Sequence, residues 1–268
     1  MSRAIFLMQN FKVVLEYNGA DFFGFQKQPG KPTIQQAFED ALSKLFNHPM
    51  KIASASGRTD TGVHAQNQIV NFKVETRLNK HQILMGLNRY LPPSVAVKKV
   101  EKVKNSFHSR FDAKSKIYEY RVWNSSVRAP LKSGRAYQCP FKLNFSEMKK
   151  GAGILKGRHD FKAFCGAGGL SPGKAGKGTV PSEGDSIKDT VRTIKRFTLD
   201  RKGDVIRFTV EADGFLHHMV RNLVGTLLEV GRGKISCASL KEIIASRDRR
   251  KAGMTAPAHA LTLLTVRY

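Results

Sequence analysis

One short run of residues places a carboxylate, an arginine and a histidine around two glycines. The run is Gly57-Arg58-Thr59-Asp60-Thr61-Gly62-Val63-His64-Ala65. The glycines allow a sharp turn or a close approach to a ligand, and the threonines can hydrogen-bond locally and fix the loop. Arg58 would favour the ionised form of Asp60, which a nucleophile or base needs at neutral pH. An Asx turn with a surface ion pair uses the same residue types, so the pattern by itself leaves both interpretations open.

Two later residues could act together with this carboxylate. Tyr118 lies in a strand pattern and shares a face with Tyr120 and Val122, where core packing and a place in a cleft are both open. Arg221 lies at the edge of the apolar stripe of a helix predicted over 215–230. Its guanidinium could reach a buried carboxylate or extend into water.

The same predicted helix carries two adjacent histidines. The apolar stripe is formed by Leu216, Met219, Val220, Leu223, Leu227 and Val230. Because His217 and His218 are adjacent, we expect their rings to face different ways on a helix, and we expect neither to bind a metal. His64 could contact a phosphate, although a histidine in a turn often only satisfies local hydrogen bonds.

The run from Gly57 to Ala65 closely resembles the catalytic loop of the TruA-type tRNA pseudouridine synthases. Other segments resemble family motifs in the same order: Tyr17-Asn18-Gly19, Gly24-Phe25-Gln26-Lys27-Gln28, Lys116-Ile117-Tyr118-Glu119-Tyr120, His159-Asp160-Phe161, 215–222 and Thr255-Ala256-Pro257-Ala258. Phe25 stands where the family has Trp, and Ala260 where it has Gly. The resemblance covers nearly the whole chain.

This resemblance implies isomerisation of uridine to pseudouridine in the anticodon stem-loop of tRNA, without a cofactor or a metal. It implies that Asp60 is catalytic, that Arg221 pairs with Asp60 inside a cleft, and that Tyr118 stacks on the target uracil and takes part in proton transfer. The substrate-binding residues that we expect are Arg58, Thr59, His64, Gln26 and Lys116. A homodimer bridged by tRNA is implied by the resemblance only.

Two other functions remain as alternatives. One is a non-catalytic tRNA-binding or RNA chaperone protein of the same fold, and the other is an RNA-active hydrolase that liberates uracil. The loop offers no clear second carboxylate, which argues against an ordinary glycoside hydrolase because that reaction uses an acid and base pair.

The composition independently indicates a polyanionic partner. The chain of 268 residues has 46 Lys+Arg against 21 Asp+Glu, a formal net charge of +25. Such an excess attracts nucleic acid through counterion release, although charge alone does not separate RNA from DNA or an anionic membrane. We expect no membrane segment and a cytoplasmic location, and three isolated cysteines, Cys139, Cys165 and Cys237, predict reduced thiols.

A glycine-rich stretch over 166–188 lacks an apolar period, which predicts a mobile insertion, either a basic flap that contacts RNA or a surface segment without a role. Gly168, Gly173 and Lys174 have P-loop spacing, but Ala175 replaces the Ser or Thr that binds Mg²⁺, so we expect no nucleotide cofactor.

The pattern of strands and helices that would position these residues predicts an α+β fold. Two similar α/β-sandwich halves, 1–105 and 106–268, are expected to have antiparallel sheets joined into one sheet, with a basic cleft between them. The predicted strands cover 11–17, 51–53, 68–74, 95–103, 118–123, 190–199, 205–212 and 261–268, and the predicted helices 33–46, 80–90, 146–155 and 215–230, with one more helix after it. Thr33 is expected to cap the first helix, with Gln36 three residues on.

Overall fold

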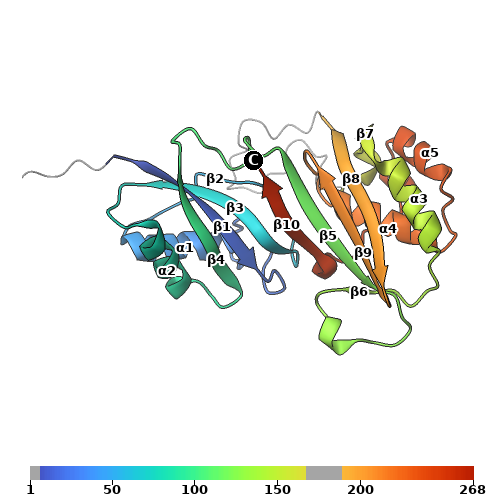
Figure 1. Ribbon diagram of the computed structural model, residues 1–268, viewed down its shortest axis with the longest axis horizontal. Helices are drawn as coiled ribbons and strands as arrows, with labels where there is room; N and C mark the ends of the chain where they lie inside the picture. The colour runs from blue at the N-terminus through green and yellow to red at the C-terminus, as the bar shows by residue number, and fades with distance from the viewer. Residues whose placement is uncertain (1–6, 167–188) are drawn as a thin grey trace, which may run out of the picture. The chain divides into compact units, whose positions relative to one another are not determined.

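The computed structural model describes residues 7–166 and 189–268, and the chain divides into two compact units (Figure 1). Unit 1 consists of Met1–Ile117 and Leu261–Tyr268, and unit 2 of Tyr118–Ala260. The sequence predicts two halves that meet near residue 105, and that division stays a prediction. The final strand belongs to unit 1 because it pairs with a strand of that unit, an association that a pattern read along the chain does not reveal.

In unit 1, helices pack on a mainly antiparallel sheet. Its elements are β1 (Gln9–Tyr17), α1 (Ile34–Phe46), β2 (Ser54–Ala55), β3 (His64–Val74), α2 (Lys80–Tyr90), β4 (Val95–Val103) and β10 (Leu261–Arg267). The strand order is β4-β1-β3-β10, with β2 also paired to β3. β1 is antiparallel to both neighbours, whereas β10 runs parallel to β3.

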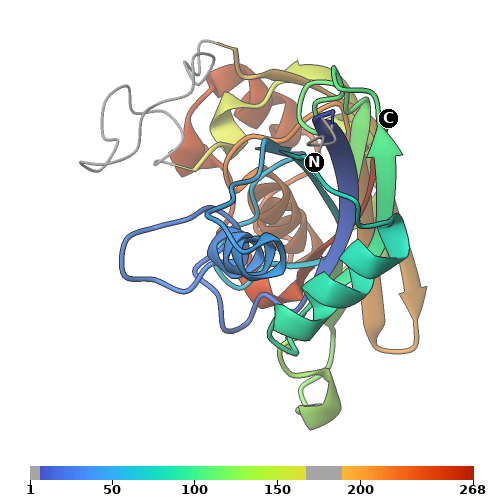
Figure 2. The same cartoon turned by 90° about the vertical axis from the view of Figure 1, so that its left-hand side faces the viewer.

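Phenylalanines from the strands and from α1 form the core of this unit. Phe11 and Phe72 stack with 5.6 Å between ring centroids, and Phe38 of α1 meets Phe72 edge-on at 6.5 Å. The three rings are almost fully buried, and burying one such side chain contributes about 1.5–3 kcal/mol. Figure 2 shows α1 and α2 on the same side of these strands. This core therefore stabilises the sheet from which the Asp60 loop extends.

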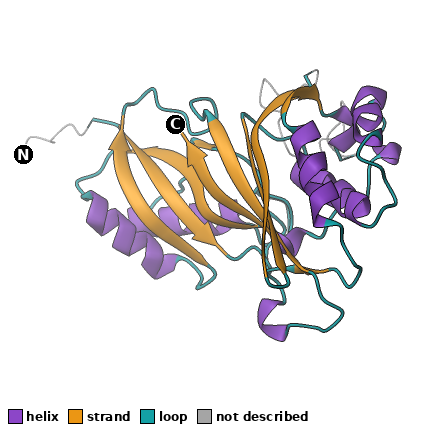
Figure 3. Cartoon of the chain, turned by 45° about the vertical axis from the view of Figure 1, so that its right-hand side comes forward, coloured by secondary structure: helices purple, strands orange, loops and turns teal. Residues whose placement is uncertain are grey.

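In unit 2 the helices gather beside the strands (Figure 3). Its elements are β5 (Ser115–Trp123), whose first residues belong to unit 1, then β6 (Tyr137–Gln138), α3 (Phe145–Leu155), β7 (Gly157–Asp160), β8 (Val191–Lys202), β9 (Val205–Ala212), α4 (Met219–Gly231) and α5 (Ser239–Ser246). The strand order is β5-β9-β8-β7, and β6 runs parallel to β5. The predicted α+β class with mainly antiparallel strands is confirmed.

The apolar stripe predicted for the late helix is confirmed, but the predicted first residue of that helix is wrong. The six stripe residues are all buried, yet α4 begins at Met219 rather than at Phe215. His218 adopts a left-handed conformation with φ 58°, which breaks the helix before Met219. The glycine-rich stretch 166–188, including its P-loop spacing, lies outside the described residues except for Gly166.

Candidate active site

Asp60 lies on the loop between β2 and β3, next to the first residues of β3. The Val63 amide donates to the carbonyl of Asp60 at 3.1 Å, and Gly62 has φ 79°, so the chain turns sharply directly after the carboxylate. Asp60 is half-buried, Arg58 is exposed and Thr59 is buried. The turn therefore holds one partly accessible carboxylate directly after an exposed arginine and an anchored threonine.

A second loop, which follows β1 and contains Gly19 and Gly24, packs directly against this turn. A Cβ at Gly19 would overlap the carbonyl of Val63, and one at Gly24, where φ is 84°, would lie 2.7 Å from the carbonyl of Thr59. The Phe25 amide donates to that same Thr59 carbonyl at 3.0 Å. Glycine is needed at both positions because the two backbones approach too closely for a side chain.

Buried polar side chains of the neighbouring strands hold the Asp60 loop through hydrogen bonds. The Tyr17 hydroxyl and Thr59 Oγ1 are 2.8 Å apart, and the Gln68 amide donates to the carbonyl of Gly57 at 2.9 Å. The Ser56 hydroxyl donates to Gln68 Oε1. Burial raises the pKa of Tyr17 to about 12, so its hydroxyl remains a neutral hydrogen-bond partner at physiological pH. Ser56 and Gln68 were missed by the sequence analysis, and so was the link between Tyr17 and Thr59, because polar residues on strands give no signal that they share one buried network.

His64, predicted as a substrate contact, is buried at the start of β3. Its Nδ1 accepts from the backbone N–H of Gly19 at 3.1 Å. This bond leaves the proton of the neutral ring on Nε2. The ring ties the opening loop to the Asp60 loop, and a direct contact between His64 and the substrate stays a proposal.

Two of the other predicted substrate contacts are placed within unit 1 near the same loop. Lys116 Nζ lies 3.2 Å from the position that a Cβ on Gly57 would take, so the missing side chain of Gly57 leaves room for the lysine. Gln26 is half-buried and follows Phe25, whose amide is bound to Thr59. Lys116 adds a second positive charge beside the segment that also carries Arg58.

In unit 2, Tyr118 lies at the unit's first position, in β5. Its ring meets the Phe215 ring edge-on, with 5.1 Å between centroids, and it is 7% exposed. Tyr120, on the same face of β5, is fully buried and donates from its hydroxyl to the carbonyl of Pro257 at 2.9 Å. Phe215 therefore sets the orientation of the Tyr118 ring, and Tyr120 has a structural contact of its own.

Arg221 lies in the first turn of α4 and is bonded to the chain's closing segment. Its Nε donates to the carbonyl of Ala256 at 2.7 Å, and the Ala256 amide donates back to the carbonyl of Arg221 at 3.2 Å. A Cβ at Gly225 would overlap the carbonyl of Met254, so this segment crosses α4 at close range. The ion pair predicted between Arg221 and Asp60 joins residues of different units and stays a prediction.

Arg249 supports this arrangement and was missed by the sequence analysis. Its guanidinium donates to Asn222 Oδ1 and Thr255 Oγ1, both at 3.0 Å, and to the carbonyl of Gly253 at 2.8 Å. Burial lowers the pKa of Arg249 from its ordinary value. Arg249 lies in a run of charged residues, where the sequence does not distinguish this half-buried arginine from its exposed neighbours.

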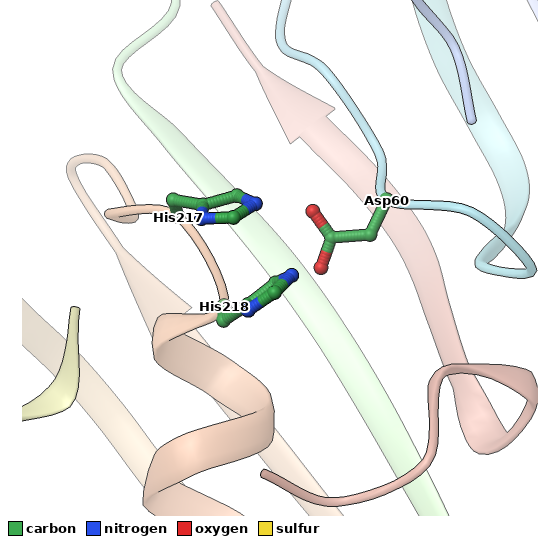
Figure 4. Close-up of side chains that lie close together, drawn as sticks. All are labelled: Asp60, His217 and His218. Carbon is green, nitrogen blue, oxygen red and sulfur yellow. The ribbon is translucent and has the colours of Figure 1, made fainter. Parts of the chain in front are cut away.

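The two adjacent histidines do not diverge as expected. Their rings stack with 3.7 Å between centroids, because both precede α4 and the left-handed His218 turns the backbone between them. Figure 4 shows them at the turn into α4, and it also shows Asp60 on its loop before β3. A Cβ at Gly166 would lie 2.7 Å from Nδ1 of His218 and 2.8 Å from Nδ1 of His217, so the backbone at Gly166 packs on the pair. The helical spacing argument against a metal ligand therefore does not apply.

Among the described residues, no helix is both long enough and apolar enough to cross a membrane.

Comparison with known proteins gives one consistent result. The family model described as tRNA pseudouridine synthase matches residues 13–112 and 152–268. A tRNA pseudouridine synthase A of Acetivibrio thermocellus is 39% identical over 261 residues, which cover 97% of this chain and 100% of the relative. One of Geobacillus kaustophilus is 38% identical over 98% of this chain and 95% of the relative, and a tRNA pseudouridine synthase A 2 of Clostridium perfringens is 38% identical over 97% and 100%. The residues matched by the family model include Asp60 and Arg221, whereas Tyr118 lies between the two matched ranges.

Proposed function

The chain belongs to the tRNA pseudouridine synthase family, and we propose that it isomerises uridine to pseudouridine in the anticodon stem-loop of tRNA. The observation that carries the proposal is the match of the family over almost the whole chain, including the loop on which Asp60 is held. The anchoring of that loop by Tyr17, Gln68 and His64 supports a role that needs one oriented carboxylate.

The reaction is an isomerisation in which atoms and electrons balance within the substrate. The bond between uracil N1 and ribose C1′ breaks, the base turns, C5 bonds to C1′, and the proton at C5 is exchanged for one at N1. The proposed role of Asp60 is to attack C1′ or to remove a ribose proton, and either role requires the carboxylate in its ionised form. Arg58 within the loop and Lys116 beside Gly57 supply positive charge on the same stretch of chain.

Tyr118 and Arg221 complete the proposed site. The ring of Tyr118, oriented by Phe215, would stack on the uracil, and its hydroxyl would take part in the proton transfer at C5. Arg221, whose Nε is bonded to the carbonyl of Ala256, is proposed to pair with Asp60, because a guanidinium carries several N–H donors that suit a carboxylate. A target base must leave its stack to reach such residues.

We extend the proposal to the predicted contacts with tRNA and to the assembly. Arg58, Thr59, His64, Gln26 and Lys116 are proposed as substrate-binding residues, Thr59 and His64 by holding the loop. The charge of +25 supports binding of the tRNA backbone. A homodimer that shares tRNA and a cytoplasmic location are further proposals.

Nucleoside analysis of an unmodified tRNA incubated with the protein tests the activity. Enzymatic digestion should yield pseudouridine in place of uridine, with the total number of bases in the RNA unchanged. Free uracil in the medium would indicate a hydrolase. A tRNA that is bound but unaltered would indicate the non-catalytic alternative.

A further inference from the structure

Figure 1 shows the connection between β4 and β5, which follows Val103 and ends at Ser115. Polar side chains of unit 1 hold this connection in place. Ser109 at its centre is fully buried, and its amide donates to Ser54 Oγ at 3.0 Å and to Asn71 Oδ1 at 3.2 Å. The carbonyl of Ser109 accepts from the Tyr268 hydroxyl at 2.7 Å, and the Asn10 amide donates to the carbonyl of Phe107 at 2.9 Å. A segment anchored in this way presents its exposed side chains in a fixed arrangement.

This anchored segment exposes a phenylalanine. Phe111 is 71% exposed, the most of any phenylalanine among the described residues. By contrast, Phe107 of the same segment packs on the ring of Tyr268, with 5.2 Å between centroids. The fold therefore uses Phe107, and nothing among the described contacts gives Phe111 a comparable place in the core. Because single exposed apolar side chains are common on protein surfaces, an argument for binding depends on the groups around Phe111.

The groups around Phe111 form a stacked cluster of an aromatic ring, an imidazole and a guanidinium. The His108 ring stacks on Phe111 with 4.3 Å between centroids and 25° between the planes, and the Arg110 guanidinium lies 5.7 Å from the centre of the Phe111 ring. His108 Nδ1 accepts from the amides of Arg110 and Phe111 at 3.2 and 3.3 Å, which fixes the imidazole. The His108 amide in turn donates to Asp112 Oδ2 at 3.0 Å.

We propose that Phe111, supported by His108 and flanked by Arg110, is a stacking platform for an unpaired nucleobase of the tRNA. That the RNA is a tRNA rests on the proposed function. Aromatic rings bind unstacked bases through their faces without regard to sequence, and an arginine beside the ring attracts both the base and its phosphate. From Lys104 to Lys114 the segment carries three basic residues against one acidic residue, a charge that suits RNA. The platform would bind RNA outside the reacting nucleotide and would contribute affinity, not chemistry.

The test compares Phe111→Leu with Phe111→Trp, using tRNA affinity at fixed salt. The Leu variant keeps apolar surface but loses the ring face, so the Kd should rise about tenfold, since stacking one base contributes about 1–3 kcal/mol. The Trp variant should bind within about threefold of wild type. Because Phe111 has no charge, the salt dependence of binding should be the same in all variants. Leu131→Ala, at a fully exposed apolar position, is the matched control and should not change the Kd.

Fluorescence gives a direct second readout. The chain has one tryptophan, Trp123, so the indole introduced by Phe111→Trp adds an emission that should be quenched when tRNA binds, with wild type as the reference. Equal affinity of the Leu variant, or an indole that tRNA does not quench, overturns the proposal. A change in self-association without a change in tRNA affinity also overturns it and assigns Phe111 to a protein contact.

The platform and the proposed activity fail in different ways. Absence of pseudouridine with the wild-type protein contradicts the activity, whatever the affinities of the variants. If the platform alone is wrong, the wild type and Phe111→Leu both form pseudouridine and bind tRNA equally well. If it is right, turnover of the Leu variant at saturating tRNA should equal that of wild type, because only binding is affected.

Discussion

Arg58, Thr59 and Asp60 are neighbours in the sequence, yet each lies in a different environment. The arginine is exposed, the threonine is buried and bonded to Tyr17, and the aspartate is half-buried. Because the burial of successive side chains differs, one short loop can be anchored by Thr59 while the side chain of Asp60 stays partly accessible. The chemistry can therefore be tested at Asp60 without disturbing the anchor.

Asp60→Asn keeps the size of the side chain and removes the charge that attacks or abstracts. The rate of pseudouridine formation should fall by at least ~10³, or ~4 kcal/mol of transition-state stabilisation. The affinity for tRNA should stay within about tenfold, because the bonds that hold the loop at Thr59 and Gly57 are left in place by the substitution. Single-turnover kinetics and binding are measured on one preparation. A near wild-type rate would contradict the catalytic assignment, and a joint loss of binding and thermal stability would indicate misfolding.

Tyr118→Phe tests the hydroxyl apart from the ring. If the hydroxyl moves the C5 proton, turnover should slow by roughly 10²-fold while RNA binding is nearly intact, since the ring and its contact with Phe215 remain. The control is Tyr120→Phe in the same strand, which loses the bond to Pro257 and should lower stability more than turnover. Wild-type turnover in Tyr118→Phe would reduce Tyr118 to a packing residue.

At the scale of elements, β1 and β3 hold the Asp60 loop through Tyr17 and Gln68. Tyr17→Phe leaves Thr59 Oγ1 without its 2.8 Å partner inside the fold, which should lower the free energy of unfolding by about 1–3 kcal/mol. A loosened carboxylate should lower kcat by about tenfold with little change in KM, because orientation rather than binding is lost. Tyr90→Phe, at an exposed position, serves as the control. An unchanged kcat in Tyr17→Phe would remove the positioning role.

The same tyrosine predicts a dependence of stability on alkaline pH. The pKa of Tyr17 is raised from 10.0 to about 12 by burial, so above pH 10 the unfolded chain releases the proton first. The stabilising effect is complete below pH 10 and is lost as pH rises towards 12. Urea unfolding should show a shallower decline over this range in Tyr17→Phe than in wild type. Burial also raises the pKa of Tyr120 and Tyr268, so the decline should be reduced and not abolished.

The sequence predicts the helices and strands well where capping or turn residues and the hydrophobic period indicate the same bounds. The ranges predicted for α2, β4 and β9 match the structure, and Thr33 caps α1 by accepting from the Gln36 amide, although the Gln36 side chain bonds Asp40 instead of completing a capping box. The short strands β6 and β7 were missed because they span too few residues to show a period. The start of α4 was placed too early because an apolar stripe carries no sign of a left-handed residue.

The candidate site was predicted less completely than the fold, for a physical reason. Asp60, Tyr118 and Arg221 are predicted as site residues because their motifs resemble a family, and their roles stay predictions, whereas the Tyr17 network and the Arg249 cluster depend on contacts between distant segments. Arg249 reaches Asn222 across 27 positions and Tyr17 reaches Thr59 across 42. Local patterns do not encode such pairings, so the sequence indicates candidate reactive groups but not the residues that hold them.

For the whole molecule, the charge of +25 predicts that tRNA binding weakens steeply with salt. If six lysines or arginines each neutralise a phosphate, the slope of log affinity against log salt should be about −5. Filter binding or fluorescence titration over a series of salt concentrations measures the slope. An affinity that is the same at low and moderate salt would contradict the electrostatic argument while leaving the chemistry at Asp60 untouched.

The most direct test of the whole account is tritium release from an unmodified tRNA labelled at C5 of its uracils. Forming a bond from C5 to C1′ displaces the label, so the wild-type protein should release tritium to water while the base stays in the RNA, and Asp60→Asn should release almost none. Retention of the label by an RNA that the protein demonstrably binds, or release of labelled free uracil, would contradict the assignment of this chain as a uridine isomerase.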